Sequence, residues 1–334
     1  MKNKVSSTER TFKIAGILLL VILVFVSLIS GRYPLTLEEI LRIILEKSTD
    51  ETSRQVFLTL RLPRTIMAVV AGGALSIAGG IYQNLFKNPL ATPDIIGVSS
   101  GASLGVAFAI LFLGGFQFML PISAFIGGIL TILLVFLLSR MSRESEILSF
   151  IVSGIVVSAL VKGVLMTLKY FADPQNQLAA IEYWTMGSLS AITEKKVLLV
   201  LPLVAVSLFA LYLLRWKISV LSLSDDEAAS LGVAVGRTRL TVILFSTMLV
   251  SSVISVTGPV GFIGLISPHL TRRLLKRNDF GMILLSGILG AVIMLTADIL
   301  AKSLGTSEIP VSIFTTFIGA PYLAFLLISE RRRG

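Results

Sequence analysis

Long apolar stretches of about twenty residues recur from one end of the chain to the other, separated by short polar connections. Each stretch is long enough to cross the hydrocarbon core of a bilayer as a helix. Because lipid offers the backbone no hydrogen-bond partner, a spanning segment must satisfy its own amides, and uninterrupted apolar runs of this length indicate helices. The sequence therefore predicts an all-α, polytopic membrane protein with one transmembrane domain over residues 1–334.

Nine of these stretches are clear, and a tenth is interrupted. The clear ones lie near residues 12–31, 65–84, 95–113, 117–139, 147–168, 197–214, 240–257, 280–301 and 309–329. The interrupted stretch, residues 258–275 (GPVGFIGLISPHLTRRLL), contains two prolines and three glycines. It predicts a short, broken helix that protein rather than lipid must surround. Ten transmembrane helices would leave both termini in the cytoplasm, where the basic tail ERRRG is preferred.

Charge is scarce and unevenly distributed. Only 14% of residues are charged, with 29 Lys+Arg against 19 Asp+Glu and a net charge of +10. In the ten-helix arrangement most of this excess falls on the inner connections, so it reflects membrane orientation rather than a nucleic-acid-binding surface. The first outer connection, residues 32–64, mixes both signs, and its pattern LEEILRIILEK predicts an amphipathic helix outside the bilayer.

Small residues recur every fourth position in two of the predicted spans. They are Gly72, Ser76 and Gly80 in the second span, and Gly97, Gly101 and Gly105 in the third. Such stripes let helix backbones approach closely, which favours association in lipid. The connection between the two spans, NLFKNPLATPD, contains Pro89 and Pro93 and is predicted to be non-helical and shielded.

No motif for catalysis is visible. The chain has no cysteine, no phosphate-binding loop and no H-E-x-x-H pair. Its one histidine, His269, is expected to form a hydrogen bond near a helix end rather than to bind a metal. We therefore expect no enzyme activity and no bound cofactor or metal, so energy for any transport must come from a partner or from an ion gradient.

The distribution of intramembrane charge distinguishes these two energy sources. A carrier driven by protons or sodium is expected to hold carboxylates within the membrane. Asp94 and Asp298 are expected at span ends, which leaves Lys162 as the clear intramembrane charge. This pattern favours energy from a partner, with the ion-driven carrier as the alternative.

A polar insert on the inner side, residues 221–239 (LSLSDDEAASLGVAVGRTR), could contact such a partner. Its acidic residues favour a helix N-terminus, its alanines favour helix, and Gly232 can end the helix. We predict a short helix, a turn and a second short piece up to Arg237. The alternative interpretation is a solvated helix in a loop.

Several segments together resemble the iron-siderophore, haem and vitamin B12 uptake permeases, which are the membrane subunits of type II ABC importers. They are LRLPRTIMAVVAGGALSIAGGIYQNLFKNPLATPDIIGVSSGASLG (59–105), DDEAASLGV (225–233), GFIGLISPHLTRRLL (261–275), ADILAK (297–302) and EIPVSIFTTFIGAPYLAFLL (308–327). The resemblance implies a permease in the cell membrane, paired as a homodimer or close heterodimer. It also implies two cytoplasmic ATPase subunits that use Mg-ATP and an extracytoplasmic substrate-binding protein.

The resemblance also assigns roles to particular residues. It implies that residues 221–239 contact the ATPase and that the binding protein docks on basic residues at the outer side. It also implies that the fifth span lines the translocation path, with a gate at the inner start of that span. The ATPase-contacting residues are Asp226, Glu227, Ala228, Ala229, Leu231 and Gly232; the docking residues are Arg61, Arg64 and Lys302; the gate residues are Ile147 and Leu148. Lys302 stands where a relative carries arginine, so it keeps the charge without the planar fork.

Lys162 has two interpretations. It either snorkels toward the outer surface or stands in the wall of the path, where a cation would suit an anionic cargo. The wall position is preferred, and the resemblance then implies a metal chelate as cargo, with a ferric siderophore first. Haem, cobalamin or an oxyanion such as molybdate are the alternatives.

Overall fold

The computed structural model describes residues 2–45, 50–114, 118–141, 146–304 and 308–331, so the last three residues of the basic tail lie outside the described part. Within these ranges every regular element is a helix, which confirms the all-α prediction. The long helices are α1 (Lys2–Ile29), α4 (Leu62–Leu85), α5 (Val98–Phe112), α6 (Met119–Ser139), α7 (Glu146–Phe171), α9 (Glu194–Leu213), α12 (Val235–Thr257), α13 (Ile263–Leu275), α14 (Phe280–Ser303) and α15 (Val311–Arg331).

Shorter elements connect them. These are α2 (Leu37–Ile44), α3 (Glu51–Gln55), the π-helix η1 (Val56–Arg61), the 3₁₀-helix η2 (Pro93–Ile96), the π-helix η3 (Pro174–Leu178), α8 (Ala179–Thr185), α10 (Arg215–Val220) and α11 (Asp225–Ser230). Seven continuous helices in the described ranges are long and apolar enough to cross a membrane, whereas α5, α13 and the described apolar part of α15 are shorter. The protein is therefore a polytopic membrane protein.

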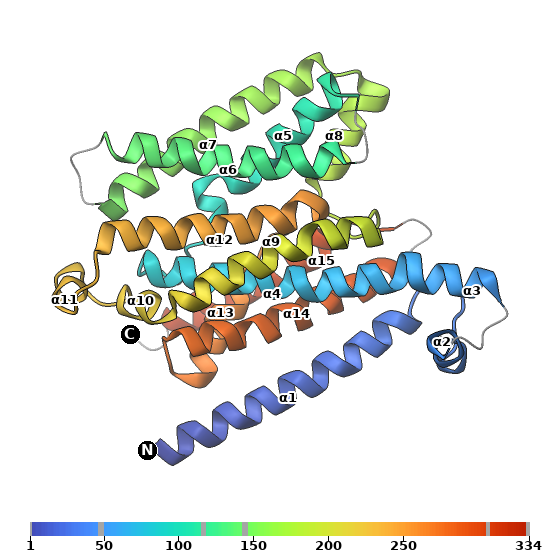
Figure 1. Ribbon diagram of the computed structural model, residues 1–334, viewed down its shortest axis with the longest axis horizontal. Coiled ribbons are helices and arrows are strands. Elements are labelled where there is room, and N and C mark those ends of the chain that lie inside the picture. The colour runs from blue at the N-terminus through green and yellow to red at the C-terminus, as the bar shows by residue number, and fades with distance from the viewer. Residues whose placement is uncertain (1, 46–49, 115–117, 142–145, 305–307, 332–334) are drawn as a thin grey trace.

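Helix α4 lies between α12 and α14 in the middle of the molecule (Figure 1). Its small-residue stripe allows α14 to approach closely, because a Cβ on Gly72 would collide with the carbonyl of Gly290. One turn further on, Ser76 Oγ donates a hydrogen bond to the carbonyl of Ser286 at 2.8 Å. The predicted packing role of this stripe is confirmed.

The second stripe packs α5 against α6. A Cβ on Gly101 would collide with the Gly127 carbonyl, and one on Gly105 would collide with the Ser123 carbonyl. Gly97 differs from the other two glycines, because it precedes α5 with a φ of +85° and is not part of the helix. The prediction of a span over 95–113 is thus corrected: η2 occupies its start, and α5 begins only after this left-handed residue.

The interrupted segment is broken as predicted. Residues 258–262 are not helical, and both Gly258 and Phe262 have a φ of +69°. Helix α13 then begins at Ile263 and lies against α4, where a Cβ on Gly79 would collide with the Gly264 carbonyl. Backbone contact of this kind requires glycine on both helices. The start of α13 is therefore packed against protein, as predicted for a broken helix.

The connection predicted to lie outside the membrane contains the expected amphipathic helix, but that helix is short. In α2, Ile40 and Ile43 are buried while Leu41 and Ile44 are exposed, and Thr36 caps its N-terminus. The rest of the connection differs from the prediction. Elements α3 and η1 continue without a break into α4, so that one apolar helix extends over Glu51–Leu85.

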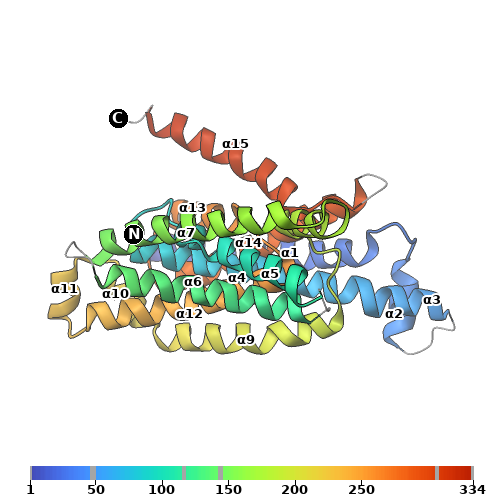
Figure 2. The same cartoon turned by 90° about the horizontal axis from the view of Figure 1, so that it is seen from above.

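The two ends of the molecule carry different elements. Helices α2 and α3 lie at one end and α11 at the opposite end (Figure 1). Helix α15 projects from the side that carries α7 and α13, away from α9 (Figure 2). The polar features predicted from the sequence therefore fall into three zones. They are the end that carries α2 and α3, named the outer end after the predicted orientation, the end that carries α11, named the inner end in the same way, and the long face of α7.

Candidate transport and coupling sites

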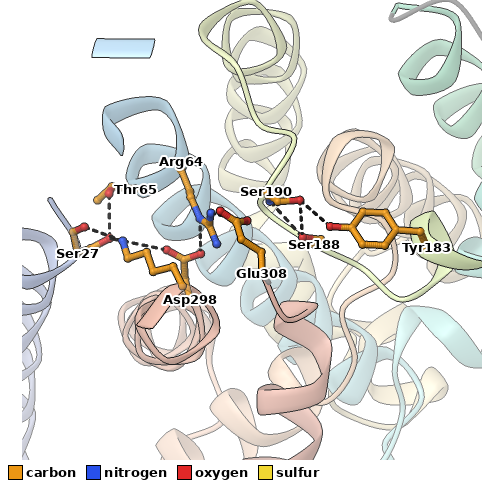
Figure 3. Close-up of polar contacts among 9 residues, drawn as sticks. Ser27, Arg64, Thr65, Tyr183, Ser188, Ser190, Asp298 and Glu308 are labelled. Carbon is orange, nitrogen blue, oxygen red and sulfur yellow. Dashed lines mark hydrogen bonds and ion pairs between the residues drawn. The ribbon is translucent and has the colours of Figure 1, made fainter. Parts of the chain in front are cut away.

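At the outer end, buried charges from two long helices meet. Arg64 on α4 donates from Nε to Asp298 Oδ1 on α14 at 2.8 Å and from Nη1 to Glu308 Oε2 at 2.9 Å (Figure 3). Lys302, one turn after Asp298, lies 3.4 Å from its other carboxylate oxygen. Lys302 Nζ also donates to the carbonyl of Ser27 on α1 at 2.6 Å and to its Oγ at 2.8 Å. The cluster therefore ties α1, α4 and α14 together.

Arg61 holds the end of α1 in a different way. Its Nη1 donates to the carbonyls of Leu28 and Ile29, each at 2.6 Å, and its Nη2 donates to the carbonyl of Tyr33. The Leu28 and Ile29 carbonyls belong to the last turn of α1, where no following helical amide can bond them, and Tyr33 lies just beyond the helix. Arg61 thus satisfies backbone carbonyls where α1 ends.

The three predicted docking residues are brought together by the fold, but largely inside the subunit. Arg61, Arg64 and Lys302 are 6%, 9% and 8% exposed. All three line a hollow of about 230 Å³, and exposed Arg32 joins them there. Internal partners bond the charged end of each of the three side chains.

Sequence reasoning missed Asp298 and Glu308 as members of this cluster. A signal for Asp298 was present, because ADILAK places it four residues before Lys302, which puts both side chains on one face of a helix. Nothing local pointed to Glu308, which meets Arg64 across 244 residues of sequence. Only the packing of α4 against α14 unites them.

At the inner end, α11 forms the predicted short helix. Ser224 Oγ accepts from the Glu227 amide at 3.3 Å, and Glu227 Oε2 accepts in return from the Ser224 amide at 2.9 Å. The Ser224 hydroxyl also donates to Glu227 Oε2 at 2.7 Å. This hydroxyl bond first, and the bond from the Ser224 amide second, lower the pKa of Glu227. Gly232 follows the helix with a φ of +79°, as predicted for a left-handed end.

One side of α11 attaches it to the body of the protein. Asp225 Oδ1 accepts from Arg239 at 2.9 Å and lies 3.5 Å from Lys87 Nζ, while Ala228 is only 1% exposed. Burial raises the pKa of Asp225, but the bonds and charges of Arg239 and Lys87 outweigh it and lower the value. The helix is thus fixed on the side that faces Arg239.

The other side of α11 is open. Five of the six predicted ATPase-contacting residues are exposed, with Ala228 as the buried exception; the exposed ones are Asp226, Glu227, Ala229, Leu231 and Gly232. The second short piece is not separate, because it forms the first turns of α12, which begins at Val235 rather than near 240. A force on α11 would therefore act directly on the inner end of α12.

Helix α7 carries the predicted gate and path residues. Ile147 is half-buried and Leu148 is 48% exposed in the first turn of the helix. Lys162 is exposed past the midpoint of the helix, and it forms no ion pair within 4.0 Å among the described residues. Its side chain therefore lies on an exposed face of α7.

The expectation that Asp94 falls at a span end is wrong. Asp94 lies in η2 and lines a small hollow with Leu75, from the middle of α4, and with Gly264, from the start of α13. The chain returns into the protein after α4, because Gly97 packs against Ser158 at the middle of α7. The carboxylate of Asp94 is therefore at half the depth of the helix bundle, and Lys162 is not the only charge there.

His269 occupies the middle of α13 rather than its end. Its Nδ1 lies 3.1 Å from the hydroxyl of Tyr322 on α15, and the two rings meet edge to face. The expected hydrogen-bonding role is confirmed, with a side-chain partner on the projecting helix α15.

Comparison with known proteins places the chain in a family. A family model described as the FecCD transport family matches residues 19–329. The chain belongs to this family. The resemblance inferred from the sequence is thereby confirmed, and the protein is a multi-pass membrane permease.

Several curated relatives match nearly the whole chain, and two serve as examples. The molybdate import system permease protein MolB of Haemophilus influenzae is 37% identical over 322 residues, which cover 95% of this chain and 95% of the relative. An iron chelatin transport system permease protein of Helicobacter pylori strain 26695 is 36% identical over 329 residues, covering 96% and 99%.

A solved structure agrees with this assignment. A metal-chelate type ABC transporter in an inward-facing conformation is similar with a TM-score of 0.86 and 35% sequence identity. The similarity covers 96% of this chain and 99% of that chain.

Proposed function

We propose that this chain is the membrane-spanning permease subunit of an ATP-driven importer for a metal chelate, with a ferric siderophore as the first candidate. The observation that carries this proposal is the family match over residues 19–329. The Helicobacter relative named for iron chelatin transport supports the chelate. Molybdate is the second candidate, favoured by the 37% identity to the molybdate permease.

The membrane topology that fits this function has ten transmembrane helices and cytoplasmic termini. The three shorter helices, α5, α13 and α15, complete the seven that are long enough alone. The half-length helices α5 and α13 are shielded by close packing on α6 and α4, as a helix that starts within the membrane requires. With this topology α11 faces the cytoplasm, and the buried charge cluster lies at the outer end.

Energy enters through α11. The ATPase subunit would bind the exposed side of α11 formed by Asp226, Glu227, Leu231 and Gly232. The attached side, through Asp225 and Arg239, would pass its movement to α12. The permease itself would not hydrolyse ATP, and Mg-ATP would be used by the two partner subunits.

The binding protein would dock at the opposite end. Arg61, Arg64 and Lys302 line the outer hollow, and exposed Arg32 extends the positive surface. Acidic side chains on the binding protein would be attracted to this surface, which steers and orients the encounter.

A second permease subunit would pack on the side from which α15 projects. Phe317, Phe325 and Ile328 on α15 are exposed apolar residues, and α7 lies on the same side (Figure 2). The translocation path would then run between the two subunits, with Lys162 in its wall and Ile147 and Leu148 near its inner gate.

Purification and reconstitution test this function. The chain alone should show no ATPase activity, and it should co-purify with a nucleotide-binding subunit encoded with it. In proteoliposomes with the ATPase and the binding protein, ⁵⁵Fe chelates or ⁹⁹Mo-molybdate should accumulate only with ATP. Uptake driven by a proton or sodium gradient without the ATPase would refute the proposal.

A further inference from the structure

Two helices begin at half the depth of the bundle and leave their N-termini there. Helix α5 starts at Val98, against the middle of α7, and α13 starts at Ile263, against the middle of α4. The residues that precede them, Gly97 and Phe262, make no side-chain hydrogen bond to the first turn. The free amides of a helix N-terminus carry a partial positive charge, which attracts anions.

A buried hydroxyl points at the first of these N-termini without a partner. Ser158 on α7 is 8% exposed, and its Oγ has no hydrogen-bond partner among the described residues. It lies against Gly97, the residue that precedes α5, where a Cβ would collide with it. A buried hydroxyl normally finds a partner, so this one is free to bond a group that enters beside Gly97.

A cation, Lys162, and a carboxylate, Asp94, lie near the start of α5. Lys162 is one turn beyond Ser158 on α7, and Asp94 is three residues before Gly97. Both are exposed in the isolated subunit and lie within electrostatic range, yet they form no ion pair within 4.0 Å in the described structure. The Asp94 carboxylate instead accepts from the Ser99 hydroxyl. A gap therefore separates the cation from its counter-charge.

We propose that Lys162, Ser158 and the N-terminus of α5 form a transient binding site for an anionic oxygen group of the cargo, with Asp94 as a competing counter-charge. The proposal rests on the proposed transport function, because it requires this face of α7 to border the path. The group is a carboxylate of a ferric chelate or an oxygen of molybdate, which share a compact, negatively charged oxygen.

Asp94 gives this site a property that transport requires. A fixed cation beside a free helix N-terminus would hold an anion tightly, whereas a nearby carboxylate weakens its binding. A path must bind its cargo strongly enough to admit it and weakly enough to release it. Removing Asp94 should therefore tighten binding, and removing Lys162 should abolish it.

A single reporter cysteine can test this site, because the natural chain contains no cysteine. Ile155→Cys places a thiol on the exposed side of α7 two turns before Lys162. The full complex, with its ATPase, is reconstituted without nucleotide, and the rate of thiol modification by an anionic methanethiosulfonate is measured. Gln175→Cys, in the connection after α7, is the control reporter.

Molybdate and ferric citrate are the two probes. Either anion should slow modification of the Ile155→Cys thiol and leave that of the Gln175→Cys thiol unchanged. With Asp94→Asn, protection should need roughly tenfold less anion, and with Lys162→Met it should disappear. Lys162→Arg should retain it. Lys169→Met, which removes another cation of α7 that pairs with Glu182 on α8, should have no effect.

The probes also distinguish the two possible sources of the anionic group. Protection by molybdate alone indicates a tetrahedral oxyanion, and protection by ferric citrate alone indicates a carboxylate chelate. Protection by neither, or protection that survives Lys162→Met, overturns the proposal. If the site behaves as expected but ATP drives no uptake, the binding site stands and the proposed transport function fails.

Discussion

The outer and inner ends of this subunit use charge in opposite ways. At the outer end, Arg64, Asp298 and Lys302 are buried and bond to one another and to backbone. At the inner end, Asp226 and Glu227 are exposed, and only Asp225 is paired with the body of the protein. The first arrangement holds helices together, whereas the second leaves a charged surface free for a partner.

This difference has a physical basis. A charged group that leaves water loses hydration free energy of roughly several kcal/mol. Partners inside the protein must offset this loss. The outer cluster has those partners, so each member depends on the others. The exposed acids of α11 remain hydrated and lose little if one is replaced, so their replacement should affect contacts beyond the subunit. Substitutions at the two ends should accordingly damage different properties.

The largest expected effect is at Arg64. Arg64→Met leaves Asp298 and Glu308 without their main cation, and removing one partner of a buried ion pair costs about 3–5 kcal/mol. We expect little folded protein in the membrane and a strongly lowered melting temperature in detergent. Fluorescence-detected size exclusion of the purified chain would measure both.

Arg32→Met is the matched control, because Arg32 lines the same hollow but is exposed. It should fold normally and weaken only the association with the binding protein. If Arg64→Met is as stable as Arg32→Met, the outer cluster does not hold the fold, and docking is its main role.

The next effect concerns coupling at Gly232. A Cβ at this position would meet no atom within 4 Å, so there is space for a side chain, but the φ of +79° disfavours one. Gly232→Val should cost roughly 1–2 kcal/mol of local strain and re-aim the chain between α11 and α12. Uptake per ATP hydrolysed in proteoliposomes should fall severalfold, while the permease stays folded.

Gly232→Asn provides the control, since asparagine tolerates the left-handed region far better than valine. It should retain most of the coupling. Equal coupling in the two variants would show that backbone geometry at this position is unimportant.

A smaller effect is expected at Glu227. Glu227→Lys removes one half of the capping box and reverses the charge at the N-terminus of α11, so it weakens the start of this helix. The amount of ATPase that co-purifies should fall severalfold. Glu38→Lys on α2, an exposed acid near the N-terminus of the outer helix, should leave it unchanged, and an equal loss in both would point to a non-specific effect.

The smallest effect is a response to acid. Both exposed capping boxes lower the pKa of their glutamates: the Thr36 backbone bond acts first on Glu39, and the Ser224 hydroxyl acts first on Glu227. A lowered pKa means that the carboxylate stabilises its helix fully above the unfolded value of 4.5. That contribution is lost as the pH falls through the lower folded value.

Hydrogen exchange should therefore show weaker protection of α2 and α11 at pH 3 than at pH 6, with α14 unchanged. Glu227→Gln should remove the pH response of α11 alone. A response that persists in this variant would have to come from Asp225, which is also paired in the folded protein.

The sequence by itself determined the helical class, the broken segment before α13, the packing stripes and the turn at Gly232. Each of these follows from local chemistry: apolar length, proline and glycine positions, and the backbone freedom of a residue without a Cβ. The exposed helix at 225–230 was predictable for the same reason, because its caps and acids act within a few residues. Local rules suffice where the interacting groups are neighbours in the chain.

Only the tertiary structure decided where charges separated in the sequence would meet. Arg64 and Asp298 are 234 residues apart, and their bond exists because Gly72 and Gly290 let α4 and α14 touch. Asp94 reaches half the depth of the bundle because the chain turns back into the protein after α4. Counting spans by length does not reveal this turn, so it placed Asp94 at the end of a span. Burial depends on which helices pack side by side, and that is a property of the assembled fold, so a linear pattern does not contain it.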